Sequence, residues 1–236
     1  MRILALDTAL GATSVVVFDT EGSRVLAEER LEMVRGHAEA LVPMVGRVLE
    51  KAGLAFQAID RFASTVGPGS FTGIRIGIAA ARAFALAHRK PVVGVSTLAA
   101  FAAPVLFGGE KRPVAAAVDA RHGMIFYQLT GADGRQMAGP GLFSLADAAR
   151  KIGSGSVIVT GDAAELLART IKEQNPDFRI GAETARPSVS PPILWVARLA
   201  SVADPSASPC RPLYLREANV TAQDGARLQR APQLGA

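Results

Sequence analysis

The chain has 236 residues, of which 49% are hydrophobic and 20% are charged, and its formal net charge is +5. This composition excludes an intrinsically disordered chain, and the length allows either one large domain or two smaller domains with separate cores. The positive charge comes from scattered arginines rather than from a basic block interleaved with aromatic residues, so charge alone does not predict direct reading of RNA.

The single cysteine and the apolar runs bear on the location of the protein. Cys210 can form no disulfide within the chain, which is typical of a reducing compartment. The first apolar run ends at Asp7 and is too short for a signal peptide. A longer uncharged run, residues 91–109, is interrupted by proline and glycine and predicts a buried strand and a buried helix rather than a membrane span. We therefore expect a cytoplasmic protein without membrane contact.

The first half of the chain predicts a βββαβαβ order of elements. Three apolar runs separated by turn residues predict two β-hairpins, and a later segment with one apolar stripe at helical spacing predicts a helix. The predicted strands are residues 3–7, 14–18, 24–33, 61–66 and 92–95, and the predicted helices are residues 38–51 and 74–88.

A glycine-rich stretch, Val66–Gly77, lies between a predicted strand and a predicted helix. Such a stretch can form an anion-sized pocket, because glycine lets the backbone approach a ligand and the first N–H groups of the helix point at it. It is not a Walker A loop, because the Lys-Ser/Thr pair after the last glycine is missing. A tight packing corner is an equally good interpretation of the same glycines.

The second half of the chain repeats the pattern of the first half at a constant offset. Three pairs of residues match in register: Asp7 with Asp119, Gly11 with Gly123, and Gly22 with Gly134. Further elements are predicted as a helix at 144–151, a strand at 157–160, a helix from 163 and a helix at 190–203. Three matches in register together with a repeated hairpin favour internal duplication over chance.

The predicted fold class is therefore α/β, with two βββαβαβ-type lobes at residues 1–108 and 109–236, the last helix being free to pack back on the first lobe. Two such lobes leave a cleft in which Asp7 and Asp119 would face each other and hold a nucleotide phosphate through Mg²⁺. This is the logic of the duplicated actin/Hsp70/hexokinase-like (ASKHA) fold. Each acid could instead cap a turn at the end of its strand. The candidate nucleotide-binding residues are Asp7, Thr8, Gly67, Gly69, Ser70 and Asp119.

Six motifs are distributed along the chain: Ile3–Thr8, Gly36–Glu39, Val66–Gly77, Gly94–Leu98, Val118–Arg121 and Pro212–Arg216. Together they resemble the bacterial TsaB family, also called YeaZ. They span nearly the whole chain, and the segment 67–73 is highly specific. The resemblance implies a role in making threonylcarbamoyladenosine on tRNA. In that pathway the paralogue TsaD transfers the threonylcarbamoyl group to the adenosine next to the anticodon, TsaB binds and supports TsaD, and the ATPase TsaE joins them.

The resemblance also predicts that this chain is not the transferase. Relatives similar to TsaD carry a His-x-x-x-His pair that holds the catalytic metal, whereas Thr97 and Phe101 occupy the corresponding positions here. No two of the three histidines have metal spacing on a shared helix, and Ser70 lies in no Gly-x-Ser-x-Gly elbow. We predict no catalytic residue and no metal site. Two alternatives stay open: an active ATP-dependent small-molecule kinase or carbamoyltransferase of the same fold, and a metal-dependent hydrolase.

A scaffold needs a surface for its partner, and the two helices of the first half are the candidates. The second helix is rich in small residues and apolar around most of its circumference, which predicts burial on both sides. The predicted interface residues are His37, Leu41, Val45, Val48, Ile74, Gly77, Ile78, Ala81 and Ala85. The alternative is that both helices pack only on their own sheet.

Partners and cofactors follow from the same resemblance. We expect a TsaD-like paralogue and a TsaE-like ATPase as partners, a homodimer in their absence, and only indirect contact with tRNA. No cofactor is expected to bind tightly, and ATP or ADP with Mg²⁺ at the partner interface stays an open alternative. The tail, residues 219–236, is expected to be partly disordered.

Overall fold

A computed structural model describes residues 1–152, 155–175 and 188–215. Arg216 and the tail, residues 219–236, lie outside the described residues. The first sheet has the strand order β3-β2-β1-β4-β5, with β1, β2 and β3 antiparallel and β4 and β5 parallel to β1. Its strands are β1 (Arg2–Asp7), β2 (Ala12–Asp19), β3 (Arg24–Glu32), β4 (Arg61–Gly67) and β5 (Val92–Ser96). Its helical segments are α1 (His37–Lys51), η1 (Phe56–Ala58) and α2 (Phe71–His88).

The second sheet repeats this arrangement with the order β8-β7-β6-β9, in which β6 corresponds to β1 and β9 to β4. Its strands are β6 (Val114–Asp119), β7 (Met124–Thr130), β8 (Gln136–Ser144) and β9 (Ile158–Thr160), and its helices are α4 (Leu145–Ile152) and α5 (Ala164–Gln174). The duplicated α/β architecture is therefore confirmed. The final strand expected for the second lobe is not found among the described residues.

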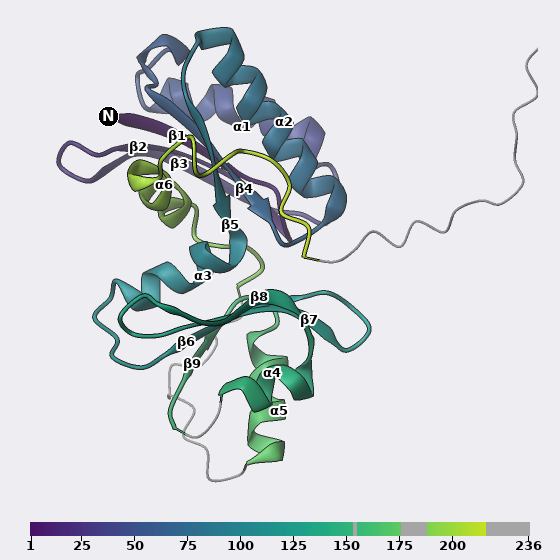
Figure 1. Cartoon of the computed structure of the whole chain (residues 1–236). Helices are drawn as coiled ribbons and strands as arrows, with labels where there is room; N and C mark the ends of the chain where they lie inside the picture. The colour runs from purple at the N-terminus through teal and green to yellow at the C-terminus, as the bar shows by residue number, and fades with distance from the viewer. Residues whose placement is uncertain (153–154, 176–187, 216–236) are drawn as a thin grey trace, which may run out of the picture.

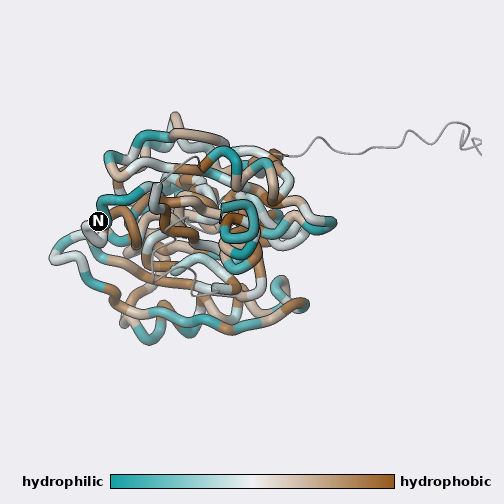
Figure 2. The backbone as a smooth tube through the Cα atoms, turned by 90° about the horizontal axis from the view of Figure 1, so that it is seen from below, coloured by the Kyte–Doolittle hydropathy of each residue, from teal (hydrophilic) through white to brown (hydrophobic). Residues whose placement is uncertain are grey.

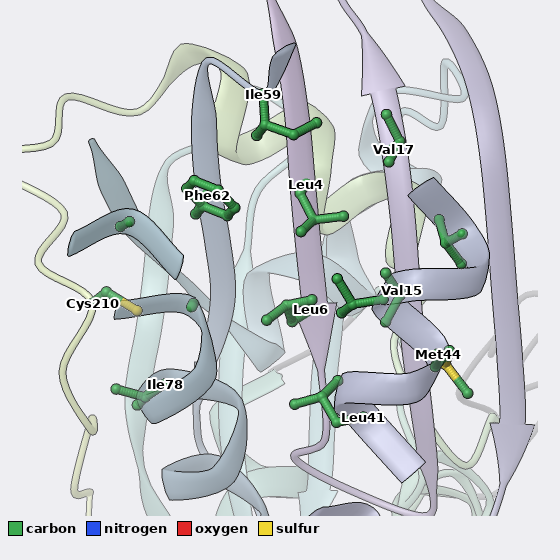
Figure 3. Close-up of a cluster of buried hydrophobic side chains, with 14 of the residues drawn as sticks. Leu4, Leu6, Val15, Val17, Leu41, Met44, Ile59, Phe62, Ile78 and Cys210 are labelled. Atoms are coloured by element: carbon green, nitrogen blue, oxygen red, sulfur yellow. The ribbon is translucent and has the colours of Figure 1, made fainter. Parts of the chain in front are cut away.

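Alternation along the strands gives the first sheet two buried faces. One face packs against α1 and α2, and Figure 3 shows its side chains from neighbouring strands beside those of the helices. The core on this face includes Leu4, Leu6, Val15, Val17, Leu41, Met44, Phe62 and Ile78. In Figure 2 hydrophobic segments run mostly through the middle of the molecule, and hydrophilic segments are frequent along its outline.

The opposite face of the first sheet is covered by α6 (Ile193–Val202), which comes from the second half of the sequence. The core on this face includes Ile3, Ala5, Val16, Phe18, Ala63, Ile193, Val196 and Ala200. The connecting helix α3 (Thr97–Leu106) lies between the two sheets (Figure 1) and packs against β6. The described part of the second half is thus divided between the two lobes. Among the described residues, no helix combines the length and the apolar character needed to cross a membrane.

Arg61 holds the end of α6 on the first lobe. Its Nη1 atom donates hydrogen bonds to the carbonyl oxygens of Ala200 at 2.6 Å and Ala203 at 2.8 Å. We expect Arg61→Met to lower the free energy of unfolding by about 1–3 kcal/mol, because these hydrogen bonds to the helix end are lost. Urea unfolding followed by circular dichroism measures this change. Arg61→Lys, which keeps a donor, should lose less, and equal losses for the two variants would contradict the proposed capping role.

Candidate functional site

The glycine-rich stretch joins β4 to α2 and packs against the turn that follows β1. The Oγ atom of Ser70 accepts a hydrogen bond from the N–H of Gly73 at 3.2 Å, so α2 begins at Phe71, three residues before the predicted start. The N–H of Ser70 donates to the carbonyl oxygen of Ala9 at 2.7 Å, and the Thr8 hydroxyl donates to the carbonyl oxygen of Gly73 at 2.7 Å. These polar groups of the loop and the turn therefore bind each other.

Three glycines of the stretch are explained by this close approach. A Cβ atom on Gly69 would overlap the carbonyl oxygen of Ala9, and a Cβ atom on Gly73 would overlap the carbonyl oxygen of Thr8. A Cβ atom on Gly77 would lie 2.7 Å from the Thr8 hydroxyl oxygen. The geometry is that of a tight packing corner, the second interpretation of the sequence.

Asp7, at the end of β1, is enclosed within the first lobe. Its side chain has no exposed surface, and its Oδ1 atom accepts hydrogen bonds from the Thr65 hydroxyl at 2.5 Å and from the N–H of Ala9 at 3.2 Å. Burial raises the pKa of this carboxyl to about 6, and the hydrogen bonds and the charge of Arg30 oppose that rise. The Oδ2 atom has no hydrogen-bond partner among the residues described. In this structure Asp7 is not accessible to a ligand.

Asp119, the counterpart of Asp7, lies in a different environment at the end of β6. Its side chain is partly exposed, and its Oδ1 atom accepts a hydrogen bond from the N–H of Arg121 at 2.8 Å. Its own N–H donates to Oδ1 of Asp162 at 2.9 Å. Burial, together with the charge of Asp119, raises the pKa of Asp162 to about 6, although backbone hydrogen bonds oppose the rise. Asp162 was not among the residues predicted from the sequence, although its place after a repeated strand was a usable signal.

Apolar side chains fill the junction between the two lobes. Leu10, from the turn after β1, and Leu215 pack against a core that includes Leu98 and Phe101 of α3. Phe126 of β7 packs against the same core. Asp7 is enclosed and Asp119 is partly exposed, and the expectation that the two carboxylates face each other across a cleft stays a prediction.

The predicted nucleotide-binding residues thus lie in different environments, some fully buried and some at the surface. The two residues at the end of the first strand, Asp7 and Thr8, are fully buried, and Gly67, Gly69 and Ser70 belong to the packing corner. Of the two candidate carboxylates, that of Asp119 is partly exposed and that of Asp7 is not. Within residues 1–152, 155–175 and 188–215, no group of three or more His, Cys, Asp or Glu side chains could hold a metal ion.

The predicted interface residues are also placed differently from the expectation, because all of them are buried. His37 is 8% exposed, and its Nδ1 atom lies 2.8 Å from the Thr13 hydroxyl oxygen, while desolvation lowers the pKa of its ring. The other eight face the first sheet and its core: Leu41, Val45, Val48, Ile74, Gly77, Ile78, Ala81 and Ala85. Their apolar stripe packs on the chain's own sheet, which corrects the prediction that it contacts a partner.

The exposed side of the same helices carries a second set of small and apolar residues. We call this surface the helix face, and it consists of Ala38, Val42, Pro43 and Gly46 of α1 and Ala79, Ala83, Leu86 and Ala87 of α2. Leu86 is 82% exposed and Val42 is 56% exposed, so sizeable apolar side chains reach the solvent there.

The duplicated sheets, with the lobes joined through α3, define a protein of the actin, hexokinase and Hsp70 class. Component A of (R)-2-hydroxyglutaryl-CoA dehydratase from Acidaminococcus fermentans shares this fold, with a TM-score of 0.50, 11% sequence identity and coverage of 85% of this chain and 97% of that one. A family model described as "TsaD: tRNA N6-adenosine threonylcarbamoyltransferase" matches residues 24–185. The chain belongs to this family and, within it, to the TsaB group.

Two relatives represent that group. The tRNA threonylcarbamoyladenosine biosynthesis protein TsaB of Escherichia coli K12 is 39% identical over 128 residues, which are 54% of this chain and 54% of the relative. The solved structure named YeaZ from Pseudomonas aeruginosa is 26% identical, with a TM-score of 0.74 and coverage of 91% of this chain and 99% of that one. The matched part of this chain spans about half the length of its curated TsaB relatives.

Proposed function

We propose that this chain is a non-catalytic partner of a TsaD-like paralogue in threonylcarbamoyl transfer to the adenosine next to the anticodon of tRNA. The TsaB name of its curated relatives supports the pathway. The enclosure of Asp7 carries the non-catalytic role, because a carboxylate without exposed surface cannot bind Mg²⁺-nucleotide in this conformation. The same observation disfavours an active kinase or carbamoyltransferase.

The remaining partners and the cofactor belong to the same proposal. A TsaE-like ATPase would join the pair, and a second copy of this chain would replace the paralogue in its absence. ATP or ADP with Mg²⁺ would lie at the partner interface rather than within this chain. The partly exposed Asp119 is the described candidate carboxylate that such an interface could use.

The helix face is the proposed contact with the paralogue. It joins the exposed sides of two neighbouring helices, and its residues are small or apolar, which permits close helix–helix approach. This surface replaces the buried apolar stripe that was predicted from the sequence to contact the same partner.

A pair of substitutions on α2 distinguishes the helix face from the buried stripe. Ala83 is exposed, so Ala83→Glu should leave the free energy of unfolding within about 0.5 kcal/mol of the parent while weakening association at least tenfold. Ala81 is fully buried, so Ala81→Glu should unfold the chain, because an unpaired charge in a core costs several kcal/mol. Thermal unfolding together with sizing alone and with the TsaD paralogue measures both effects. Unchanged association of Ala83→Glu would contradict the proposed contact.

The proposed function itself is tested by threonine incorporation into unmodified tRNA. The mixture contains the adenylate synthase, the TsaD paralogue and the TsaE ATPase, with this chain present or omitted. We expect incorporation only when this chain and TsaD are both present. Incorporation without TsaD would show that this chain is itself catalytic, and incorporation that is unchanged when this chain is omitted would contradict the partner role.

A further inference from the structure

Three arginines follow one edge of α2. Arg75, Arg82 and Arg89 are each exposed and are separated by seven residues, with Arg89 at the C-terminal cap of the helix. Seven residues make almost two helical turns, so successive arginines lie within about 20° of each other around the helix and about 10 Å apart along it. The spacing therefore produces a row of positive charge about 20 Å long.

Among the described residues, no acidic side chain forms an ion pair with this row. Within residues 1–152, 155–175 and 188–215, none of the three arginines forms an ion pair, although the adjacent Lys90 pairs with Asp60 at 3.9 Å. The helix itself contains no aspartate or glutamate. Uncompensated arginines aligned on one edge are suited to a polyanionic ligand.

Two arginines of the row lie beside the strap, which we define as residues 208–215: Arg75 contacts Tyr214, and Arg82 lies near Cys210. The strap is fixed by hydrogen bonds from the N–H of Gly94 to the Ser208 carbonyl oxygen at 2.9 Å and from the N–H of Leu213 to the Val66 carbonyl oxygen at 2.8 Å. Arg82 lies close enough to the strap for its charge to lower the burial-raised pKa of the Cys210 thiol. The yellow segment in Figure 1 shows the strap crossing the first lobe toward one end of α2.

An exposed aromatic cluster ends the row beside the N-terminus of α2. The Phe71 side chain is 64% exposed and that of Tyr214 is 55% exposed, and their ring centroids are 6.2 Å apart. The guanidinium carbon of Arg75 lies 3.2 Å from the centroid of the Phe71 ring, and its Nη2 atom donates to the Tyr214 hydroxyl at 2.6 Å. Aromatic rings and arginine planes are the groups on which unpaired bases stack.

We propose that this edge of α2 binds single-stranded RNA directly, in place of the indirect contact expected from the sequence, with the arginine row on the phosphates and the Phe71–Tyr214 cluster under a base. The charge row alone would attract an acidic protein. The two exposed rings held around a guanidinium group add a stacking surface, which suits a nucleic-acid base rather than an acidic side chain. Arg82 lies three residues after Ala79 and four residues before Leu86, so the RNA edge adjoins the helix face along α2. Binding needs no partner protein and is therefore independent of the proposed partner role.

The test is fluorescence anisotropy of a labelled 12-nucleotide single-stranded RNA titrated with the full chain. We expect saturable binding that weakens about 20-fold between 50 and 200 mM salt, as three phosphate contacts require. Arg82→Glu with Arg89→Glu should raise the dissociation constant at least about tenfold. Tyr214→Leu should weaken RNA binding while leaving the salt dependence unchanged.

A charge-matched control separates a built site from general attraction. Arg35→Glu with Arg169→Glu changes the net charge equally at two exposed arginines outside α2. Equal loss of binding in this control would overturn the proposal, as would tighter binding of a labelled polyglutamate peptide, which would identify an acidic-protein surface. Circular dichroism of each variant confirms that it is folded.

Discussion

Gly73→Ala is expected to lower the free energy of unfolding by about 2–3 kcal/mol and the melting temperature by roughly 5–10 °C. The added Cβ atom would overlap the carbonyl oxygen of Thr8, a backbone atom that is itself buried. Relief requires α2 to move away from the turn after β1, and this movement strains the hydrogen bond from the Thr8 hydroxyl to the carbonyl oxygen of Gly73. Urea unfolding of the variant and the parent measures the difference.

Gly46→Ala is the matched control for that substitution. Gly46 lies in the middle of α1, and no atom lies within 4 Å of the position that its Cβ would take. The same chemical change should therefore stabilise the protein by about 0.5–1 kcal/mol through helix propensity. If Gly73→Ala behaved like this control, the packing-corner interpretation of the glycine-rich stretch would be wrong.

As the pH rises from 4 to 7.5, the free energy of unfolding of Asp7→Asn is expected to increase by roughly 3 kcal/mol relative to that of the parent. The folded-state pKa of Asp7, about 6, lies above its ordinary value of 3.8. The folded protein therefore binds this proton more tightly than the unfolded chain does. The contribution of this proton to the stability of the parent is fully present below about pH 4 and is lost as the pH rises through 6. Asparagine does not titrate, so Asp7→Asn shows no such loss. Urea unfolding at several pH values in this range measures the difference.

Thr65→Val provides the control for the Asp7 prediction. It removes the hydrogen bond to Oδ1 that opposes the raised pKa and leaves a side chain of the same shape in the buried position. The pH range over which stability is lost should therefore move upward in Thr65→Val. Parallel stability curves for Asp7→Asn and the parent between pH 4 and pH 7.5 would show that Asp7 ionises normally, and hence that it is not enclosed as described.

Local patterns predicted the elements well because they depend on near neighbours in the chain. The apolar runs of β1 and β2 and the apolar stripe of α1 are visible in the sequence, and the structure forms those elements within a few residues of the expected bounds. The start of α2 was missed by three residues because the Ser70 cap was not considered. The repeated Asp and Gly positions also sufficed to predict the duplicated fold.

The accessibility of the candidate residues could not be predicted in the same way. Because α2 is apolar on most of its circumference, its sequence does not distinguish the half that packs on the sheet from the half that faces solvent. The buried half was therefore mistaken for the interface. The enclosure of Asp7 depends on contacts with Thr65, 58 residues away in the sequence.

By itself the sequence determined the element order, the internal duplication and the family motifs, because each is carried by residue types at short or constant spacing. Only the tertiary structure decided that the glycine-rich stretch is a packing corner, that α6 covers the first sheet, and that two arginines of the row lie beside the strap. These features are set by distant segments that pack together, such as Arg61 with the end of α6 and Leu213 with Val66. Whether a side chain is buried or exposed depends on what packs over it, and no local pattern records that.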